Sequence, residues 1–117
     1  VDTYVTKKNE YLNTLGEACD VNELFGAIQD LCQTMRGRLT KKAAEACLEW
    51  DDRVRTINTQ VLPMIRMTLS LMLAECCAYI KDMERMRTFL NEAYLLAIQL
   101  GNTEMQQRIK NVLSNLH

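Results

Sequence analysis

The chain has 117 residues, of which 48% are hydrophobic, and this is enough apolar material for a domain that folds without metals or disulfides. The formal net charge of −1 excludes a basic field over the whole surface, so nucleic-acid binding through phosphates alone is not expected. Four glycines and one proline leave a composition rich in helix-forming residues, which predicts an all-α protein.

The cysteines indicate the compartment. They are odd in number, form no C-x-x-C pair and fall on or beside apolar helical positions: Cys19, Cys32, Cys47, Cys76 and Cys77. This pattern predicts reduced core residues in an intracellular protein, either cytoplasmic or nuclear. The chain begins with Val1 and shows no signal-peptide pattern, so we interpret residues 1–117 as a single helical domain excised from a longer protein.

Two helices are predicted in the first third of the chain. The first begins near Asp2 and ends where Gly16 can supply a left-handed cap. The second begins at Asp20, which forms a capping pattern with Glu23, and it ends at Gly37. Its buried face is predicted at Val21, Leu24, Phe25, Ile28, Leu31, Cys32 and Met35.

Thr40 is the predicted cap of a third helix. Its apolar seam recurs at steps of four and three, at Ala43, Cys47, Trp50, Val54, Ile57 and Val61. Pro63 lacks an amide hydrogen and disfavours helix at Leu62, so this helix ends near Thr59 or kinks. We favour a break, with Pro63 in the first turn of the next helix.

The stretch from Val61 to Ile80 contains only two charged residues, Arg66 and Glu75, and its apolar side chains surround the helical wheel. Such a helix either spans a membrane or lies at the centre of a multi-helix core. The charges and the amphipathic flanking segments favour the core. We therefore expect helix 61–81 to be central, and we expect no membrane span.

Two further helices complete the prediction. Asp82 caps the fifth helix, Gly101 ends it, and Thr103 with Gln106 forms a capping-box pattern for the sixth. Their apolar stripes are Met86, Leu90, Ala93, Tyr94 and Ala97, and Met105, Ile109, Val112, Leu113 and Leu116. Because every connection is short, we expect an antiparallel helical bundle, or a short stack of helical hairpins, of five to six helices.

The segment LMLAECCAYIKDMERMRTFLNEAYLLAIQLGN resembles a hairpin of the tetratricopeptide-repeat family. Large and small residues lie near that family's spacing at Leu73, Ala74, Cys77, Met86, Leu90 and Ala93, and the ending AIQLGNTEMQQRIKNVL is similar to repeats that run into a following helix. The resemblance covers residues 64–116, without the family's signature aromatic pair and closing proline. It implies a protein-interaction scaffold whose concave face holds a peptide or partner helix.

Catalytic patterns are nearly missing from the sequence. His117 is the only histidine, so the sequence offers no Ser-His-Asp or Cys-His system and no His/Cys metal site. Cys76 and Cys77 lie in an apolar context that favours core packing. We therefore expect a non-enzymatic protein with no cofactor; an enzyme using Glu75 as acid or base would lack a second catalytic group.

Charged residues within the helices have structural interpretations. A mixed cluster on the third helix is typical of a solvated face: Glu49, Asp51, Asp52, Arg53 and Arg55. Arg66 and Glu75 point to nearly opposite sides of their helix, so each needs its own partner or a route to solvent. We favour a structural ion pair or a snorkelling side chain over an opening or a contact with another chain.

A basic turn joins the second and third helices. It contains Arg36, Arg38, Lys41 and Lys42 and lies beside the amino end of the third helix, where free amide groups also attract anions. A solvated turn is the favoured interpretation, because no glycine-rich phosphate loop or stacking aromatic accompanies the charges. An anion-binding or nucleic-acid-binding module is the alternative function.

The main functional hypothesis is an apolar surface rich in Met and Leu. Methionines gather along the fourth and early fifth helices, where they are expected to fill the core or, alternatively, to line an adaptable groove. Three apolar residues lie off the main stripe of the fifth helix. The predicted partner-binding residues are Met64, Met67, Met83, Met86, Leu95, Leu96 and Ile98. We expect a scaffold, adaptor or oligomerisation domain that binds a partner helix, a peptide or its own copy.

Overall fold

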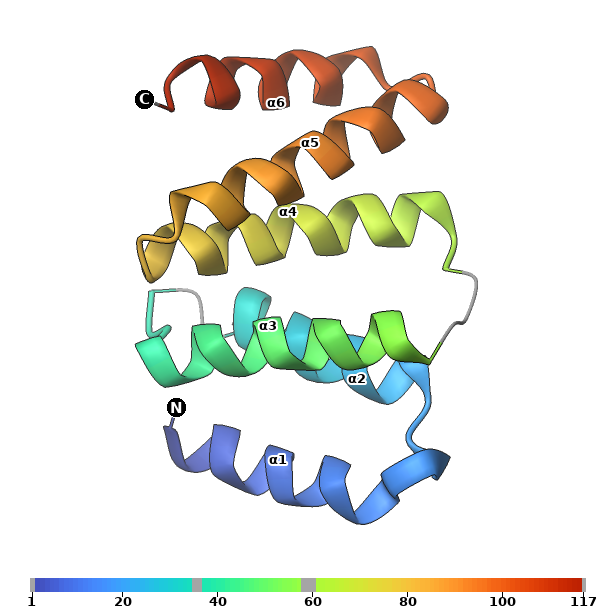
Figure 1. The fold of residues 1–117 in the computed structure, drawn as a ribbon, viewed down its shortest axis with the longest axis vertical. Helices are drawn as coiled ribbons and strands as arrows, with labels where there is room; N and C mark the ends of the chain where they lie inside the picture. Colours follow the sequence, from blue (N-terminus) through green and yellow to red (C-terminus); the bar gives the residue numbers. More distant parts are fainter. Residues whose placement is uncertain (1, 35–36, 58–60, 117) are drawn as a thin grey trace. The chain divides into compact units, whose positions relative to one another are not determined.

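Helices form nearly all of the described chain (Figure 1). The computed structural model describes residues 2–34, 37–57 and 61–116, and these contain six α-helices and no strand. The α-helices are α1 (Asp2–Leu15), α2 (Val21–Gln29), α3 (Lys41–Thr56), α4 (Pro63–Tyr79), α5 (Met83–Gln99) and α6 (Thr103–Ser114). A 3₁₀ turn, η1 (Gly16–Ala18), precedes α2, and a π-helical turn, η2 (Asp30–Thr34), follows it. The all-α prediction is confirmed.

Contacts between the helices divide the chain into two compact units, Val1–Gln60 (unit 1) and Val61–His117 (unit 2). In unit 1, α3 packs against α1 and α2. In unit 2, α5 packs against both α4 and α6, and these three helices run in alternating directions. Unit 2 is therefore a short stack of antiparallel helices.

Trp50 organises the core of unit 1. It is fully buried, and its Nε1–H donates to Asn9 Oδ1 at 2.6 Å, which ties α3 to α1. Arg53, one turn further along α3, donates to the Leu12 carbonyl at 3.4 Å. The other large side chains of unit 1 with no exposed surface are Leu12, Leu24, Ile28, Leu31 and Val5. The two hydrogen bonds join α3 to α1 at positions about one turn apart on each helix.

Local sequence signals set most helix boundaries. The predicted caps at Asp20, Thr40 and Asp82 are confirmed, because each side-chain oxygen accepts a hydrogen bond from the backbone N–H three residues later. The predicted break before Pro63 is also confirmed: α3 ends at Thr56, and α4 begins at Pro63, whose missing N–H matters least in a first turn. The predicted end of this helix near Thr59 lies outside the described residues.

The turns α4–α5 and α5–α6 are built alike. Lys81 and Gly101 have φ of 63° and 68°, the left-handed conformation that closes a helix. After each, an N–H reaches back to the preceding helix, from Asp82 to the Cys77 carbonyl and from Asn102 to the Ala97 carbonyl, both at 2.9 Å. The two turns therefore reverse the chain in the same number of residues.

The start of α6 corrects the predicted capping box. Asn102, and not Thr103, is the N-cap, because its Oδ1 accepts from the Met105 N–H at 3.0 Å. Gln106 instead donates from its side chain to the Ala97 carbonyl at 3.4 Å. The Asn102 backbone N–H also closes α5 in the preceding turn. Asn102 therefore ends α5 with its backbone and begins α6 with its side chain.

The predicted second helix departs from a regular α-helix before its end. The α-helical part stops at Gln29 and continues as the π-helical turn η2, while Gly37 has the expected positive φ of 84°. Met35, assigned to the buried stripe, lies outside the described residues. A π-turn changes the angular step between residues, yet Leu31 and Cys32, which lie in η2, are buried as predicted.

The most apolar helix is covered along one side only. Buried residues of α4 are Met67, Leu69, Ser70, Leu73, Ala74, Cys76 and Cys77, and its exposed residues include Met64, Ile65, Thr68, Glu75 and Tyr79. The prediction that this helix is buried on all sides, because apolar residues surround its helical wheel, is therefore wrong. In the part of the chain that the structure describes, no helix has the length and apolar composition to cross a membrane.

Candidate interaction surfaces

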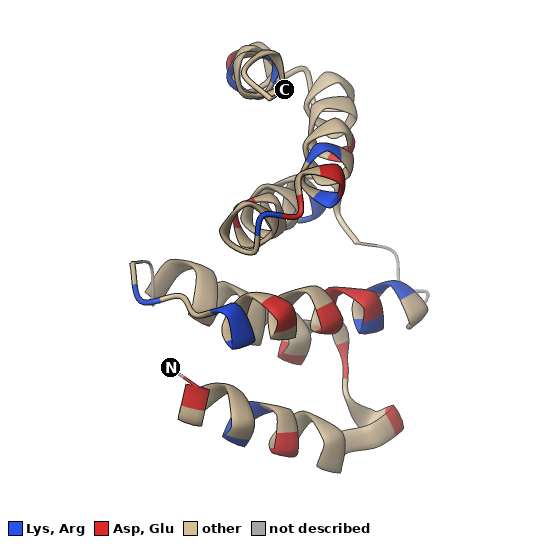
Figure 2. Cartoon of the chain, turned by 60° about the vertical axis from the view of Figure 1, so that its left-hand side comes forward, with Lys and Arg blue, Asp and Glu red and all other residues tan. Residues whose placement is uncertain are grey.

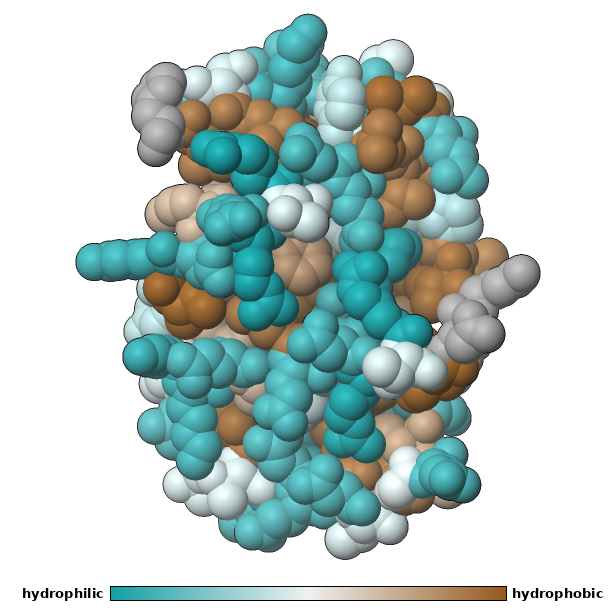
Figure 3. Space-filling view, in the orientation of Figure 1, coloured by the Kyte–Doolittle hydropathy of each residue, from teal (hydrophilic) through white to brown (hydrophobic). Residues whose placement is uncertain are grey.

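Exposed apolar side chains concentrate in unit 2. Among the described residues, nine of the eleven large exposed apolar side chains belong to this unit: Leu62, Met64, Ile65, Tyr79, Met83, Leu95, Ile98, Leu100 and Val112. Unit 1 contributes only Tyr11 and Ile57. In Figure 3, apolar atoms reach the surface in patches over the region where Figure 1 places α5 and α6.

The second half of α5 carries the clearest pair. Leu95 and Ile98 are 66% and 49% exposed and lie three residues apart, on neighbouring positions of one helix face. No charged residue occurs between Glu92 and Glu104, whereas Glu84, Arg85 and Arg87 mark the start of the helix. Figure 2 shows this contrast as coloured first turns and an uncharged C-terminal part of α5. We call Leu95 and Ile98 the α5 apolar pair.

The other predicted partner-binding residues lie at different depths. Met64 and Met83 are exposed, and Met86 and Leu96 are half-buried. Met67 is only 5% exposed and belongs to the core, so its prediction as a partner-binding residue is wrong. Met67 lies three residues before Ser70 and seven before Ala74, so it shares the covered side of α4 with these two buried residues.

The apolar stripe of α6 is partly uncovered. Ile109 is 1% exposed and is the single buried residue of this helix. Val112 is exposed, and Met105, Leu113 and Leu116 are half-buried. Packing on α5 therefore covers the middle of the stripe more completely than its C-terminal end, which adds apolar surface to unit 2.

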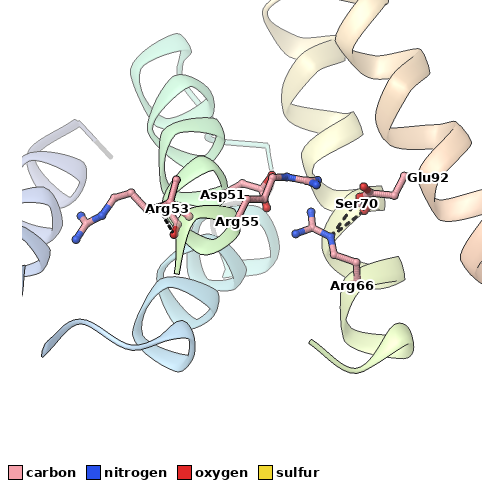
Figure 4. Close-up of polar contacts among 7 residues, drawn as sticks. Asp51, Arg53, Arg55, Arg66, Ser70 and Glu92 are labelled. Atoms are coloured by element: carbon pink, nitrogen blue, oxygen red, sulfur yellow. Dashed lines mark hydrogen bonds and ion pairs between the residues drawn. The ribbon is translucent and has the colours of Figure 1, made fainter. Parts of the chain in front are cut away.

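A polar cluster joins α4 to α5 (Figure 4). Arg66 Nε lies 3.2 Å from Glu92 Oε1 and 3.3 Å from Ser70 Oγ, and Ser70 donates to the same Glu92 oxygen at 2.5 Å. Arg66 is mostly buried and Ser70 fully so, so these groups replace the water they lose. The favoured interpretation of Arg66 as part of a structural ion pair is confirmed. Glu75, predicted on nearly the opposite side of the helix, is exposed.

One member of the mixed charge cluster on α3 contradicts the prediction. Asp51 was assigned to a solvated face but is 1% exposed, and Arg55 Nε pairs with its Oδ2 at 2.9 Å (Figure 4). Glu49 and Asp52, its neighbours, are exposed as expected. The i to i+4 spacing of Asp51 and Arg55 was the available signal, because burial of a carboxylate requires such a partner.

The basic turn is largely engaged within unit 1. Arg38, Lys41 and Lys42 are exposed, while Arg36 lies outside the described residues. Lys42 Nζ donates to Thr6 Oγ1 at 2.8 Å, and Lys41 Nζ lies 3.9 Å from a carboxylate oxygen of Glu45. Glu45 partly offsets the charge of Lys41, whereas the neutral Thr6 hydroxyl orients Lys42 and leaves its charge in place.

A polar groove in unit 1 was not predicted. Its volume is about 400 Å³, and its lining residues come from α1, α2 and η2: Lys8, Gly26, Gln29, Asp30, Gln33 and Thr34. Asp30 Oδ2 accepts from the Tyr4 hydroxyl at 2.6 Å, and Asp30 Oδ1 accepts from Thr34 Oγ1 at 3.5 Å. Burial, reinforced by the hydrogen bond to Asp30, raises the pKa of Tyr4 to about 12. Sequence reasoning missed the groove because α1 and η2 meet only in the tertiary structure.

Comparison with known proteins adds no family assignment. No protein-family model, no curated protein and no solved structure matches this chain.

Proposed function

We propose that this chain is a non-enzymatic protein-interaction domain that binds an amphipathic partner helix through the apolar surface of unit 2. The observation that carries the proposal is the concentration of exposed apolar side chains there, nine of eleven among the described residues. Single exposed apolar residues are ordinary, but a concentration on one unit is typical of interaction surfaces.

The α5 apolar pair is the proposed anchor. Covering one exposed Leu or Ile side chain contributes about 1.5 to 3 kcal/mol, so two neighbouring residues supply a substantial part of a micromolar affinity. A partner helix presents apolar residues at i, i+3, i+4 and i+7, and this spacing matches anchors that lie one turn apart on α5. The exposed residues Met64 and Met83 supply further adaptable contacts, since methionine side chains follow irregular partners.

The stacking of unit 2 supports a scaffold role. Three antiparallel helices joined by two equivalent turns are the arrangement expected of a helical-hairpin repeat, in which each helix packs on its neighbours. We propose, on this support, that residues 64–116 form a tetratricopeptide-like hairpin followed by a third helix. In such arrays the apolar surface left by one hairpin receives a peptide, a partner helix or a second copy.

The test is binding of a fluorescein-labelled model amphipathic helix, followed by fluorescence anisotropy. Leu95→Asp is expected to weaken binding about 30-fold, because about 2 kcal/mol of apolar burial is lost. The matched control is Asn91→Asp, an exposed position one turn earlier in α5 that receives the same charge. Helicity by circular dichroism should be unchanged in both variants.

Equal affinity of the Leu95→Asp and Asn91→Asp variants would refute the proposal. Unfolding of the Leu95→Asp variant would mean that Leu95 belongs to the core. If the same surface binds a second copy of this chain, sedimentation velocity of the unmodified chain at increasing concentration should show a dimer. Leu95→Asp should then convert the dimer to a monomer.

The alternative function is anion or nucleic-acid binding through the basic turn. The dependence of binding on salt concentration distinguishes this function from binding of a partner helix. The supporting observation is the exposure of Arg38, Lys41 and Lys42 at the start of α3. Binding of a single-stranded oligonucleotide probe there should fall steeply with ionic strength, whereas binding of the model helix to unit 2 should change little.

A further inference from the structure

The polar groove of unit 1 contains a glycine that unit 1 itself does not require. Gly26 lies inside α2, has no positive φ, and a Cβ built there would meet no atom within 4 Å. Glycine inside an exposed helix is less favourable than alanine, so neither backbone conformation nor internal packing explains it. Because Gly26 lines the groove, its missing side chain leaves backbone accessible to a molecule outside the chain.

Two glutamines line the same groove one turn apart. Gln29 ends α2 and Gln33 lies in η2, so their Cβ atoms are about 5 to 6 Å apart. Each amide offers both a donor and an acceptor. Along one edge of an extended peptide, N–H and C=O groups recur every second residue, about 6.5 to 7 Å apart. Two glutamine side chains that start at this spacing are long enough to reach two successive peptide units on one edge of an extended chain.

The charged residues that line the groove favour a neutral, dipolar ligand over an ionic one. The lining holds one cation, Lys8, and one carboxylate, Asp30. Lys8 Nζ lies 5.2 Å from the centre of the Tyr11 ring, and Asp30 already accepts hydrogen bonds from Tyr4 and Thr34. An ionic ligand would meet one attractive and one repulsive group, whereas a neutral amide chain would meet no net opposition.

We propose that the polar groove of unit 1 binds an uncharged, extended peptide backbone, with the Gln29 and Gln33 side-chain amides each pairing with one peptide unit beside the bare backbone of Gly26. This site lies in unit 1 and is independent of the apolar surface of unit 2. A segment that binds here is recognised by its backbone, so its side chains vary freely wherever they point away from the groove.

Nuclear magnetic resonance of the full chain tests the proposal, because Gln side-chain NH₂ groups and the Gly amide give separate signals. The probe is N-acetyl-trialanine amide, titrated to about 10 mM, a range suited to a ligand with few hydrogen bonds. We expect saturable shifts at Gly26, Gln29 and Gln33. The N-methylated form of the same peptide lacks the N–H donors and should bind at least about fivefold more weakly.

Gly26→Ala separates binding from folding. The added methyl group has open space within the chain, so the variant should melt at the same temperature or a few degrees higher. Its peptide-induced shifts should nevertheless be lost, because the methyl group occupies the groove.

Three results would overturn the proposal: no shift at the three residues, equal binding of the N-methylated peptide, or full binding by Gly26→Ala. Raising the salt to about 0.5 M should leave the shifts unchanged, since no net charge is involved. Loss of the shifts in salt would be a fourth contrary result, because it would mean that charged groups of the groove hold the neutral peptide. A failure of any of these tests leaves the α5 apolar pair, which lies in the other unit, unaffected.

Discussion

The two equivalent turns of unit 2 permit an exchange experiment. Lys81 adopts a positive φ that costs a non-glycine residue about 1 to 2 kcal/mol, and Gly101 adopts nearly the same φ without that cost. Both residues are exposed, and a Cβ at Gly101 would meet nothing within 4 Å, so only backbone conformation differs. Lys81→Gly is therefore expected to stabilise the protein.

The expected gain follows from two opposing effects. Relief of the left-handed strain contributes about 1 to 2 kcal/mol, and the greater freedom of glycine in the unfolded chain removes about 0.5 to 1 kcal/mol. The midpoints of these two ranges, about 1.5 and about 0.75 kcal/mol, leave a net gain of about 0.75 kcal/mol. An unfolding entropy of about 2.1 cal/mol/K per residue gives about 0.25 kcal/mol/K for 117 residues, so the melting temperature should rise by about 2 to 4 °C.

Thermal and urea unfolding, followed by circular dichroism, measure this change. Gly101→Lys is the matched control and should destabilise by a similar amount, and the exchanged double variant should return close to the original stability. Measurement in about 0.5 M salt removes the small contribution of a lysine charge near a helix C-terminus. A lower melting temperature for Lys81→Gly, or no effect of Gly101→Lys, would refute the backbone explanation.

Three further predictions test individual contacts. Ile109→Ala removes the single buried side chain of α6 and should lower the free energy of unfolding by about 2 to 4 kcal/mol. Hydrogen exchange should show early loss of protection in α6, and full protection would contradict the packing of α6 on α5. Asn9→Ala removes the acceptor of the Trp50 indole N–H and should lower the free energy of unfolding by about 1 to 3 kcal/mol. Urea unfolding followed by the fluorescence of this sole tryptophan measures the change, and an unchanged midpoint would exclude the hydrogen bond. The pKa of Tyr4 is raised from 10.0 to about 12, so the folded state holds its proton longer than the unfolded state does, and the stability this gives is present below pH 10 and lost as pH rises toward 12. Tyr4→Phe should lack that decline, and identical pH profiles of the two proteins between pH 10 and 12 would reject the assignment.

The α5 apolar pair shows how much of a surface site can be predicted from sequence. Leu95 and Ile98 were identified because they lie off the main stripe of their helix, and the structure leaves both exposed. Met67 was included wrongly, because on a helix with apolar residues all round no stripe separates covered from uncovered positions. The polar groove could not be found at all, since its two sides are far apart in the chain.

The sequence by itself determined the helical class and most helix ends, as at Asp20, Thr40, Pro63 and Gly101. These signals act within one turn of the backbone, where a side-chain oxygen, a missing N–H or a missing Cβ decides the conformation. Only the tertiary structure decided which charges are buried, as for Asp51, and which polar groups pair between helices. Burial depends on desolvation by neighbouring helices, and pairing between helices depends on partners distant in sequence; the local pattern contains neither.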